Sequence, residues 1–360
     1  MRGTNQGQQA IFTLVTPAQV VPVEHPIRKI KDLADQELRA LSPVFDQMYA
    51  DTGRPSIPPE TLLKSCLLIA LFSVRSERQF CEHLGYNLLF RWFLDQTLND
   101  EPFDHTVFAK NKARMLESEV ARKFFDGIVG QAKKAQLLSA EHFTVDGTLI
   151  EAWASIKSFK PKDGSKKNDP PPSDPGNPSV DFHGEKRSNK THQSTTDPEA
   201  LLAKKGKGKE AKLSYSANVL MENRNGLVVD IRVEKADGFA ERRAALEMIA
   251  RKGARGTRVR TLGADKAYDE KDFVQLLRLV GITPHVAAKE TTILDGRTTR
   301  HVGYGISQRI RKKVEEIFGW MKTVGGFRKT RYRGAERTSL WAYVTGSAYN
   351  LLRMAKLMTA

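Results

Sequence analysis

Cysteine is scarce in this sequence, because Cys66 and Cys81 are the only two among 360 residues. Two cysteines cannot build a disulfide framework, and this pair lacks the CxxC spacing of a zinc site. We expect both to pack as small apolar side chains. The eight histidines are scattered, without the i, i+4 spacing that places two imidazoles on one helix face, so we expect no histidine-based metal site.

Long apolar runs are also missing. The longest, Leu67 to Phe72, falls far short of the roughly 20 residues that a membrane-spanning helix needs. The first residues, MRGTNQGQQAIFTLV, lack the apolar region of a signal peptide. We therefore expect a cytoplasmic protein without a membrane partner.

Acidic residues are outnumbered by basic ones. The chain has 42 Asp and Glu against 58 Lys and Arg, a net charge of +16 and a pI near 9.7. Such a balance favours a polyanionic partner, because each Lys or Arg placed on a phosphate releases condensed counterions. Nucleic acid is the first candidate, ahead of an acidic membrane surface, which the sequence otherwise gives no reason to expect.

Residues 1–135 are predicted to form an all-helical domain, since stretches such as PPETLLKSCLLIALFSV carry apolar residues at helical spacing. Lys110, Lys112 and Arg114 lie close to a turn, where a helix could read DNA. This interpretation makes the region a DNA-binding and multimerisation domain. A helical bundle with a solvated basic face explains the same pattern, and both interpretations stay open.

Strand-like segments dominate residues 136–335. HFTVDGTLIEAWAS (142–155) predicts a first strand, and Asn225-Gly226 joins two more in a hairpin. RVRTLGADKAY and ITPHVAAK predict two further strands that alternate with helices. The order predicts an α/β fold, a ribonuclease H-like mixed five-stranded sheet with flanking helices. A C-terminal helix follows at residues 336–360.

Residues 157–212 interrupt this order. Hydrophobic residues almost vanish here, and the segment holds seven of the sixteen prolines in the chain. We expect a long polar, basic loop inserted between the first two strands of the sheet.

Three acidic residues occupy comparable places on this scaffold: Asp146 in the first strand, Asp265 at the end of the fourth strand, and Glu315 on the helix after the fifth. Converging carboxylates repel by on the order of 4 kcal/mol per close pair at an effective dielectric near 20. They are therefore rarely gathered without a hard cation such as Mg²⁺ or Mn²⁺. Two such ions can activate a hydroxyl and stabilise the leaving oxygen in a phosphodiester displacement.

Each acid also has a purely structural interpretation. Asp146 precedes a glycine, which usually indicates a turn, although strand-like residues continue past it. Asp265 fits an ordinary loop, and Glu315 and Glu316 could form i, i+4 ion pairs with Arg311 and Lys312. For each acid considered alone, the structural interpretation is favoured. For the three acids considered together in this element order, a metal-binding catalytic site is favoured.

Helix geometry separates the two glutamates only in part. A single helix over residues 309–322 would bury Ile310, Val314, Ile317 and Met321 on one stripe. One shoulder of that helix would then carry Arg311, Glu315 and Lys322, an arrangement that lets a carboxylate hold a metal ion between two phosphate-binding cations.

The motifs TVDGT, GADKAYD and R-x3-E-x6-K (Arg311, Glu315, Lys322) together resemble the signature of the DDE transposases of bacterial insertion sequences, in particular the insertion-sequence-five group. The likeness extends to RPSIPPETLLKSCLLIALFSVRSERQ and to HGEKRSNKTHQSTTDPEA. It therefore spans most of the chain. The family's glutamate block often begins with tyrosine three residues before the arginine, where this chain has Gln308.

The resemblance implies a transposase that binds the inverted repeats at the ends of an element, cleaves the DNA and joins the ends to a target. Asp146, Asp265 and Glu315 would be its catalytic metal ligands, for two Mg²⁺ or Mn²⁺ ions. The partners would be double-stranded DNA and a second copy of the chain. The residues implied to hold phosphates are Arg311, Lys322, Arg328, Lys329, Arg331 and Arg333.

Two alternatives remain at this stage. A structure-specific nuclease or resolvase could use the same scaffold without joining ends. A non-catalytic DNA-binding regulator derived from a transposase would explain the basic charge, but it gains nothing from three mutually repelling acids.

Overall fold

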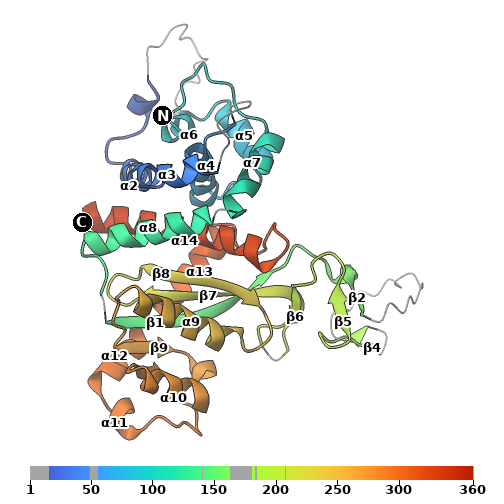
Figure 1. Ribbon diagram of the computed structural model, residues 1–360, viewed down its shortest axis with the longest axis vertical. Helices are drawn as coiled ribbons and strands as arrows, with labels where there is room; N and C mark the ends of the chain where they lie inside the picture. The colour runs from blue at the N-terminus through green and yellow to red at the C-terminus, as the bar shows by residue number, and fades with distance from the viewer. Residues whose placement is uncertain are drawn as a thin grey trace, which may run out of the picture.

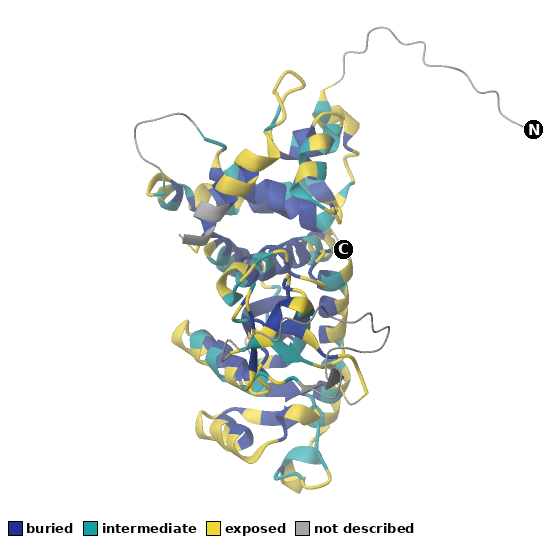
Figure 2. Ribbon diagram, turned by 90° about the vertical axis from the view of Figure 1, so that its right-hand side faces the viewer, coloured by how far each residue is buried: buried dark blue, intermediate teal, exposed yellow. Residues whose placement is uncertain are grey.

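The computed structural model describes residues 16–48, 56–117, 119–139, 141–162, 181–182, 185–206 and 208–359. Figure 1 shows a helical region at one end and a mixed sheet with its flanking helices below it. Two long helices, α8 (Val120–Lys134) and α14 (Ala335–Thr359), lie between them. Buried residues fill the centre of the helical region and of the sheet region in Figure 2. The helices at the end opposite the N-terminal region are mostly exposed.

The N-terminal part is helical, as the sequence predicts. Its helices begin at recognisable caps: the Ser76 side chain accepts a hydrogen bond from the backbone N–H of Gln79, and Pro59 occupies a first turn where no backbone donor is needed. Cys66 is buried in the core here, as expected. The helices are α1 (Pro17–Val20), α2 (Pro26–Ala40), α3 (Ser42–Asp46), α4 (Pro59–Leu71), α5 (Glu77–Leu84), α6 (Leu88–Phe93) and α7 (His105–Glu117).

Helix α14 joins the two parts of the molecule, because it packs on α2, α4 and α8 and also on strand β8 (Val228–Lys235). Leu351 and Met354 of this helix lie in the N-terminal core, whereas Ala342 and Tyr349 lie in the core of the sheet. The C-terminal helix therefore completes the hydrophobic core of the N-terminal helices. Among the described residues, no helix combines the length and the apolar character needed to cross a membrane.

The main sheet has the predicted five strands in the order β10-β9-β1-β7-β8. Strands β9 (Thr261–Ala264) and β10 (Thr283–Val286) run parallel to β1 (His142–Glu151), whereas β7 (Lys212–Glu222) pairs antiparallel with β1 and β8. The Asn225-Gly226 hairpin is confirmed, with Gly226 at φ +69°. This arrangement confirms the ribonuclease H-like α/β fold. A short sixth strand, β6 (Leu201–Ala203), pairs with the start of β7.

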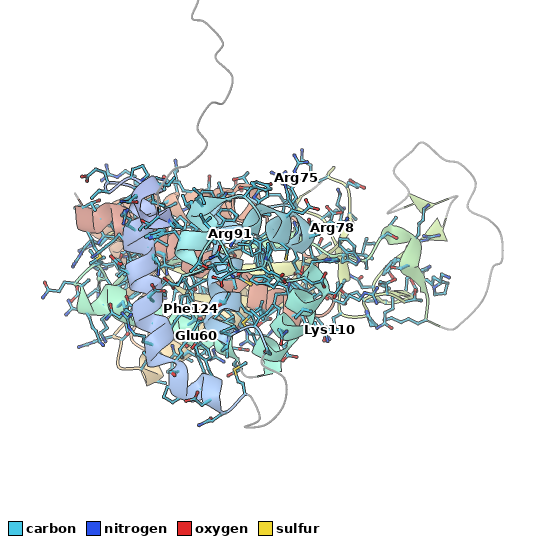
Figure 3. All side chains as sticks on the ribbon, turned by 90° about the horizontal axis from the view of Figure 1, so that it is seen from above. Glu60, Arg75, Arg78, Arg91, Lys110 and Phe124 are labelled. Carbon is cyan, nitrogen blue, oxygen red and sulfur yellow. The ribbon has the colours of Figure 1, made fainter. Side chains whose placement is uncertain are left out.

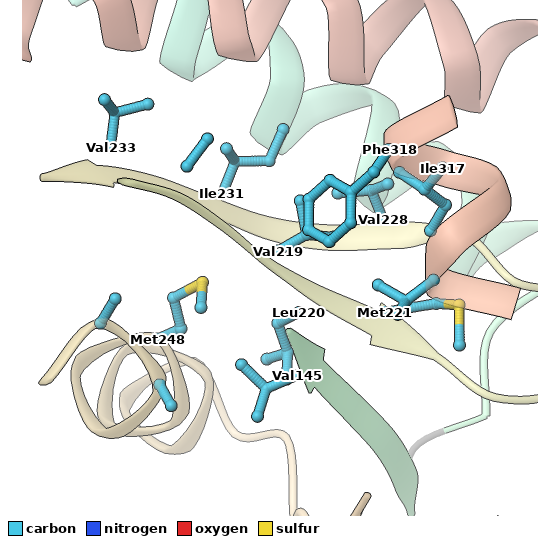
Figure 4. Packing of buried hydrophobic residues seen from close by; sticks show 14 of the residues in the cluster. Val145, Val219, Leu220, Met221, Val228, Ile231, Val233, Met248, Ile317 and Phe318 are labelled. Atoms are coloured by element: carbon cyan, nitrogen blue, oxygen red, sulfur yellow. The ribbon is translucent and has the colours of Figure 1, made fainter. Parts of the chain in front are cut away.

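Helices cover both faces of the sheet. Figure 4 shows Val145 and Leu220 directed toward Met248 of α9 (Ala240–Ala254), while Val219 and Ile231 point to the opposite side. On that opposite side, α13 (Lys313–Thr323) contributes Ile317 and Phe318 to the same core. The remaining helices of this part are α10 (Lys271–Leu279), α11 (Gly296–Thr299) and α12 (Val302–Ile310), with short 3-10 turns η1 (Ile156–Ser158) and η2 (Lys266–Tyr268).

The prediction of one helix over residues 309–322 is wrong. Helix α12 ends at Ile310 and α13 begins at Lys313. At the break, the backbone N–H of Val314 donates to the Arg311 carbonyl at 3.1 Å, which is the tighter i to i+3 pattern. The break turns Phe318 into the core and leaves Ile310 only half-buried.

The insertion is also more ordered than the predicted loop over residues 157–212. In its described part, β2 (Phe159–Pro161) pairs with β5 (His192–Ser194) and β3 (Asp181–Phe182) with β4 (Glu185–Lys186). Polar side chains replace the missing apolar core: Asn189 Oδ1 accepts from Leu202 N at 2.8 Å, and its amide donates to the Leu202 carbonyl at 2.9 Å. Residues 163–180 of the insertion lie outside the described residues.

Candidate active site

Asp146 lies in the middle of β1, where it pairs with Val219 of β7. The following Gly147 is paired with Asn218, so the Asp-Gly dipeptide is part of a strand and not a turn. A Cβ atom at Gly147 would lie 2.7 Å from Asn218 Oδ1 and 2.6 Å from Glu241 Cγ. The glycine is therefore required by the close approach of α9 to the strand.

Asp265 follows directly after β9, the strand parallel to β1. Its Oδ1 atom accepts a hydrogen bond from the Ala267 backbone N–H at 2.8 Å and so caps the turn η2. Ends of adjacent parallel strands meet at one edge of a sheet. This edge brings Asp265 beside Asp146 although the two are distant in sequence.

The two glutamates of α13 are both exposed, but they face different neighbours. Glu315 lines the same cleft as Asp146 and Asp265. Glu316 lies on the side of Tyr349 of α14, whose pKa is raised by burial and then by the charge of Glu316. The tertiary structure thus completes a separation of the two side chains that helix geometry made only in part.

The cleft has a volume of about 720 Å³ and contains acids and cations together. Within the described part of the chain, no three His, Cys, Asp or Glu side chains are close enough to hold a metal ion. The three predicted acids therefore share a cleft without forming a closed ligand set. The charged residues that line it are Asp146, Asp265, Glu315, Glu241, Lys204, Lys205, Lys322 and Arg328.

Burial, together with the charges of Asp265 and Glu241, raises the pKa of Asp146 to about 7. The Gly147 N–H, which donates to Asp146 Oδ1 at 2.8 Å, and the charge of Arg311 both act in the opposite direction. Burial and then Asp265 also raise the pKa of Glu241. The acids destabilise one another's charged forms, which is the electrostatic situation that a cation relieves.

Arg311 is held at the site by Gln308, which stands where the family often has tyrosine. Its Nε donates to Gln308 Oε1 at 2.9 Å, and the Gln308 amide donates to the carbonyl of His285 on β10 at 2.6 Å. Gln308 therefore fixes the arginine to the sheet.

Lys322 reaches across the cleft from α13, and its Nζ donates to Thr148 Oγ1 at 2.6 Å. Burial lowers the pKa of Lys322 to about 8, and the positive charges of Lys205 and Arg328 add to the effect. Cations crowded in this way, without a carboxylate partner in the described structure, favour an anionic ligand.

The four basic residues that follow α13 do not all line the same cavity. They are Arg328, Lys329, Arg331 and Arg333. Arg328 lines the cleft, and its carbonyl accepts from the Glu151 backbone N–H at 3.1 Å. Lys329 forms an ion pair with Glu151 at 3.4 Å, and with Arg331 it lines a second cavity of about 310 Å³ that borders α4 and α5. Arg333 is exposed and lines neither cavity.

The basic residues predicted on α7 do not behave alike. Lys110 is exposed, and Figure 3 shows it with Arg75 and Arg78 toward the side from which the insertion projects. Lys112 is buried; it is paired with Glu77 and donates to the Tyr332 hydroxyl at 2.8 Å. The interpretation of Lys112 as a DNA-reading side chain is therefore wrong. The Arg114 side chain lies outside the described structure.

Sequence reasoning missed three charged residues of the cleft: Glu241, Lys204 and Lys205. Glu241 stands in the first turn of α9, where an acid is expected simply for its interaction with the helix dipole. The two lysines belong to the insertion, whose polar sequence gives no sign of which residues return to the sheet. Only the packing of α9 and β6 on β1 and β7 brings these residues together.

Residues 16–114 match the family described as a transposase domain (DUF772), and residues 186–351 match the family described as a transposase DDE domain. Together the two matches cover well over half of the chain. The chain belongs to the DDE transposases. The family resemblance and the prediction of a DNA transposase are thereby confirmed, and family membership implies dependence on divalent metal ions in general. Asp265 and Glu315 lie inside the second matched segment, and Asp146 precedes it.

No curated protein matches this transposase. Among solved structures, it is similar to the piggyBac transposase synaptic complex with hairpin DNA, with a TM-score of 0.41 and 8% identity over 94% of this chain and 76% of that chain. It is also similar to a pre-cleavage Mos1 transpososome, with a TM-score of 0.21 and 11% identity over 85% and 82% of the two chains.

Proposed function

We propose that this transposase cleaves DNA at the ends of an insertion sequence and joins the freed ends to target DNA, with Asp146, Asp265 and Glu315 as its catalytic carboxylates. The observation that carries the proposal is that these three acids, from β1, the end of β9 and α13, line one cleft together with Lys322 and Arg328. The local motifs of these residues favour the insertion-sequence-five group.

The three acids fit a site for Mg²⁺ or Mn²⁺. Their carboxylate oxygens are the hard donors that these ions prefer, and the pKa of Asp146 is raised by burial and, after it, by the negative charges of Asp265 and Glu241. A bound pair of ions would supply an activated hydroxyl and stabilisation of the leaving oxygen. The protein's part is to hold the carboxylates on two strands and a helix that share one rigid core.

The cations position the DNA. Lys322 is braced by Thr148 and Arg311 by Gln308, so both present charge at fixed places beside the acids. Arg328 extends this basic surface along the cleft. Lys329, Arg331, Arg333, Lys110 and Arg114 would contact the backbone farther from the reacting phosphate, a sequence-independent contribution to affinity.

The N-terminal helical region would bind the terminal inverted repeats and support multimerisation. Two ends must be held at once for joining, which favours a homodimer. Because its substrate is chromosomal DNA, we infer that the transposase acts in the cytoplasm, on the nucleoid.

The test uses a labelled duplex carrying the inverted repeat that flanks the gene, with Mg²⁺ and a target plasmid. Wild-type protein is expected to nick the end and to transfer label to the plasmid. Asp265→Asn is expected to lose nicking while it retains most of its affinity for the duplex. Asp272→Asn, in the first turn of α10, is the matched control and should cut normally.

Two outcomes would contradict the proposal. Nicking by Asp265→Asn at the wild-type rate would remove that residue from the catalytic set. Efficient nicking by the wild type without any label on the plasmid would indicate a nuclease that does not join ends.

A further inference from the structure

Glu241 is a half-buried acid that the proposed chemistry does not yet use. It stands in the first turn of α9 and lines the cleft with Asp146 and Asp265. Its side chain lies directly over Gly147, since a Cβ atom placed there would be 2.6 Å from Glu241 Cγ and 2.8 Å from its Oε1. The residue after Asp146 is thus kept small where this carboxylate approaches the strand.

Glu241 also differs from Glu247 of the same helix and from Glu234 of the neighbouring strand β8. Glu247 of the same helix is paired with Arg232 at 2.5 Å, and Glu234 of β8 is paired with Arg243. In the described structure, the Glu241 carboxylate takes part in no hydrogen bond or ion pair. A half-buried carboxylate left in this state is costly unless a cation compensates it.

A second observation points to a ligand at the same place. Tyr268 is 0% exposed, and its hydroxyl has no hydrogen-bond partner among the described residues. The acids whose charges act on this hydroxyl are Glu241, Asp146 and Asp265. A buried hydroxyl is rarely left unpaired. Its position beside three unneutralised carboxylates indicates a site that is completed only when its ligand binds.

We propose that Glu241 is a fourth carboxylate of the metal-binding site. The inference rests on the proposed function, because it assigns a further ligand to the same ions. The position of Glu241 over Gly147 places it on the side of Asp146 formed by α9, whereas Glu315 approaches from α13. The divalent ions would then be enclosed from both helices, and the Tyr268 hydroxyl would donate to the carboxylates gathered around them.

The proposal is tested by metal binding in the absence of DNA. Mn²⁺ affinity is measured by calorimetry and by electron paramagnetic resonance on the full chain. Glu241→Gln is expected to weaken Mn²⁺ binding at least tenfold, in the range found when groups that support a metal site are removed. It should also raise the melting temperature of the metal-free protein, because the neutral amide no longer repels Asp146 and Asp265.

Two further variants make the result specific. Glu247→Gln removes an acid of the same helix that already has an arginine partner, and it should leave Mn²⁺ affinity unchanged. Glu241→Asp keeps the charge and should bind Mn²⁺ more tightly than Glu241→Gln. Wild-type Mn²⁺ affinity in Glu241→Gln would overturn the proposal, as would a loss of affinity in Glu247→Gln of the same size as in Glu241→Gln.

Asp265→Asn separates this inference from the function on which it rests. If Asp265→Asn loses Mn²⁺ binding while Glu241→Gln keeps it, the site is formed without Glu241 and only the present proposal fails. If neither variant changes Mn²⁺ binding, the metal site itself has been misassigned and both proposals fail.

Discussion

Lys322 donates a hydrogen bond from Nζ to Thr148 Oγ1 at 2.6 Å, which ties α13 to β1 two residues beyond Asp146. The contact links the helix that carries Glu315 to the strand that carries the first acid. It also holds the Lys322 amine in the cleft, where burial disfavours its positive charge.

The charge of Lys322 is expected to make DNA binding pH-dependent. Its pKa is lowered to about 8, so in the free protein the amine loses its proton as the pH rises through about 8. Affinity for an end duplex should therefore fall between about pH 7 and 9. Lys322→Arg stays charged over this range and should show a flatter profile. Fluorescence anisotropy at constant ionic strength measures both, and identical profiles would contradict the prediction.

The two glutamates of α13 should respond very differently to the same change. Glu315→Gln is expected to reduce cleavage by at least about a hundredfold, in line with the loss of a metal-site group. Glu316→Gln, on the side of Tyr349, should keep cleavage within about a factor of two and lose at most a few tenths of a kcal/mol of stability. Single-turnover cleavage distinguishes them. A reversal of the two effects would move the third acid to Glu316.

Gly147→Ala should destabilise the protein. The new Cβ would lie 2.7 Å from Asn218 Oδ1, and Asn218 is fully buried with its amide bonded to two backbone carbonyls. We expect a loss of about 1–3 kcal/mol in the free energy of unfolding. Gly253→Ala is the matched control: it is an exposed site in α9 with nothing near a Cβ, and it should stabilise the helix by about 0.5–1 kcal/mol. Urea denaturation measures both.

His285 should make the protein sensitive to mild acid. Burial lowers its pKa to about 4, and the nearby His142 and His301 add to the effect. The unfolded chain binds a proton below about pH 6.5, whereas the folded one does so only below about pH 4. The stability that neutral His285 contributes is therefore fully present above pH 6.5. It is lost as the pH falls toward 4, and the loss is at most on the order of 3 kcal/mol.

The check is urea unfolding at a series of pH values. His285→Gln should flatten the decline between pH 6.5 and 4, and the exposed His105→Gln should follow the wild type. A decline of undiminished size in His285→Gln would assign the acid sensitivity to other groups.

The strand order was predictable because each strand carries its own local signal. Val145, Leu149 and Ile150 favour a strand around Asp146, and Asn225-Gly226 requires a tight turn. Element order and chain connectivity then leave few sheets to choose from. For the same reason the sequence alone predicts Asp146 and Asp265 at one edge of the sheet.

The predictions that the structure contradicts have a common cause. Each concerns a feature that depends on contacts between segments distant in sequence. The sequence around Lys112 predicts an exposed cation. In the structure the side chain is buried against Glu77 and Tyr332. The helix over residues 309–322 breaks at Arg311, where packing on the sheet favours a buried Phe318 over a continuous helix. No local pattern carries information about such partners.

The sequence by itself determined the α/β order of elements, the basic charge and the identities of three acids, because these follow from local preferences and residue type. Tertiary structure alone decided that Glu315 faces the cleft while Glu316 faces Tyr349, and that Glu241 lies against Gly147. It also decided that α14 completes the core of the N-terminal helices. Which face of a helix is buried, and against which partner, depends on the packing of the whole chain.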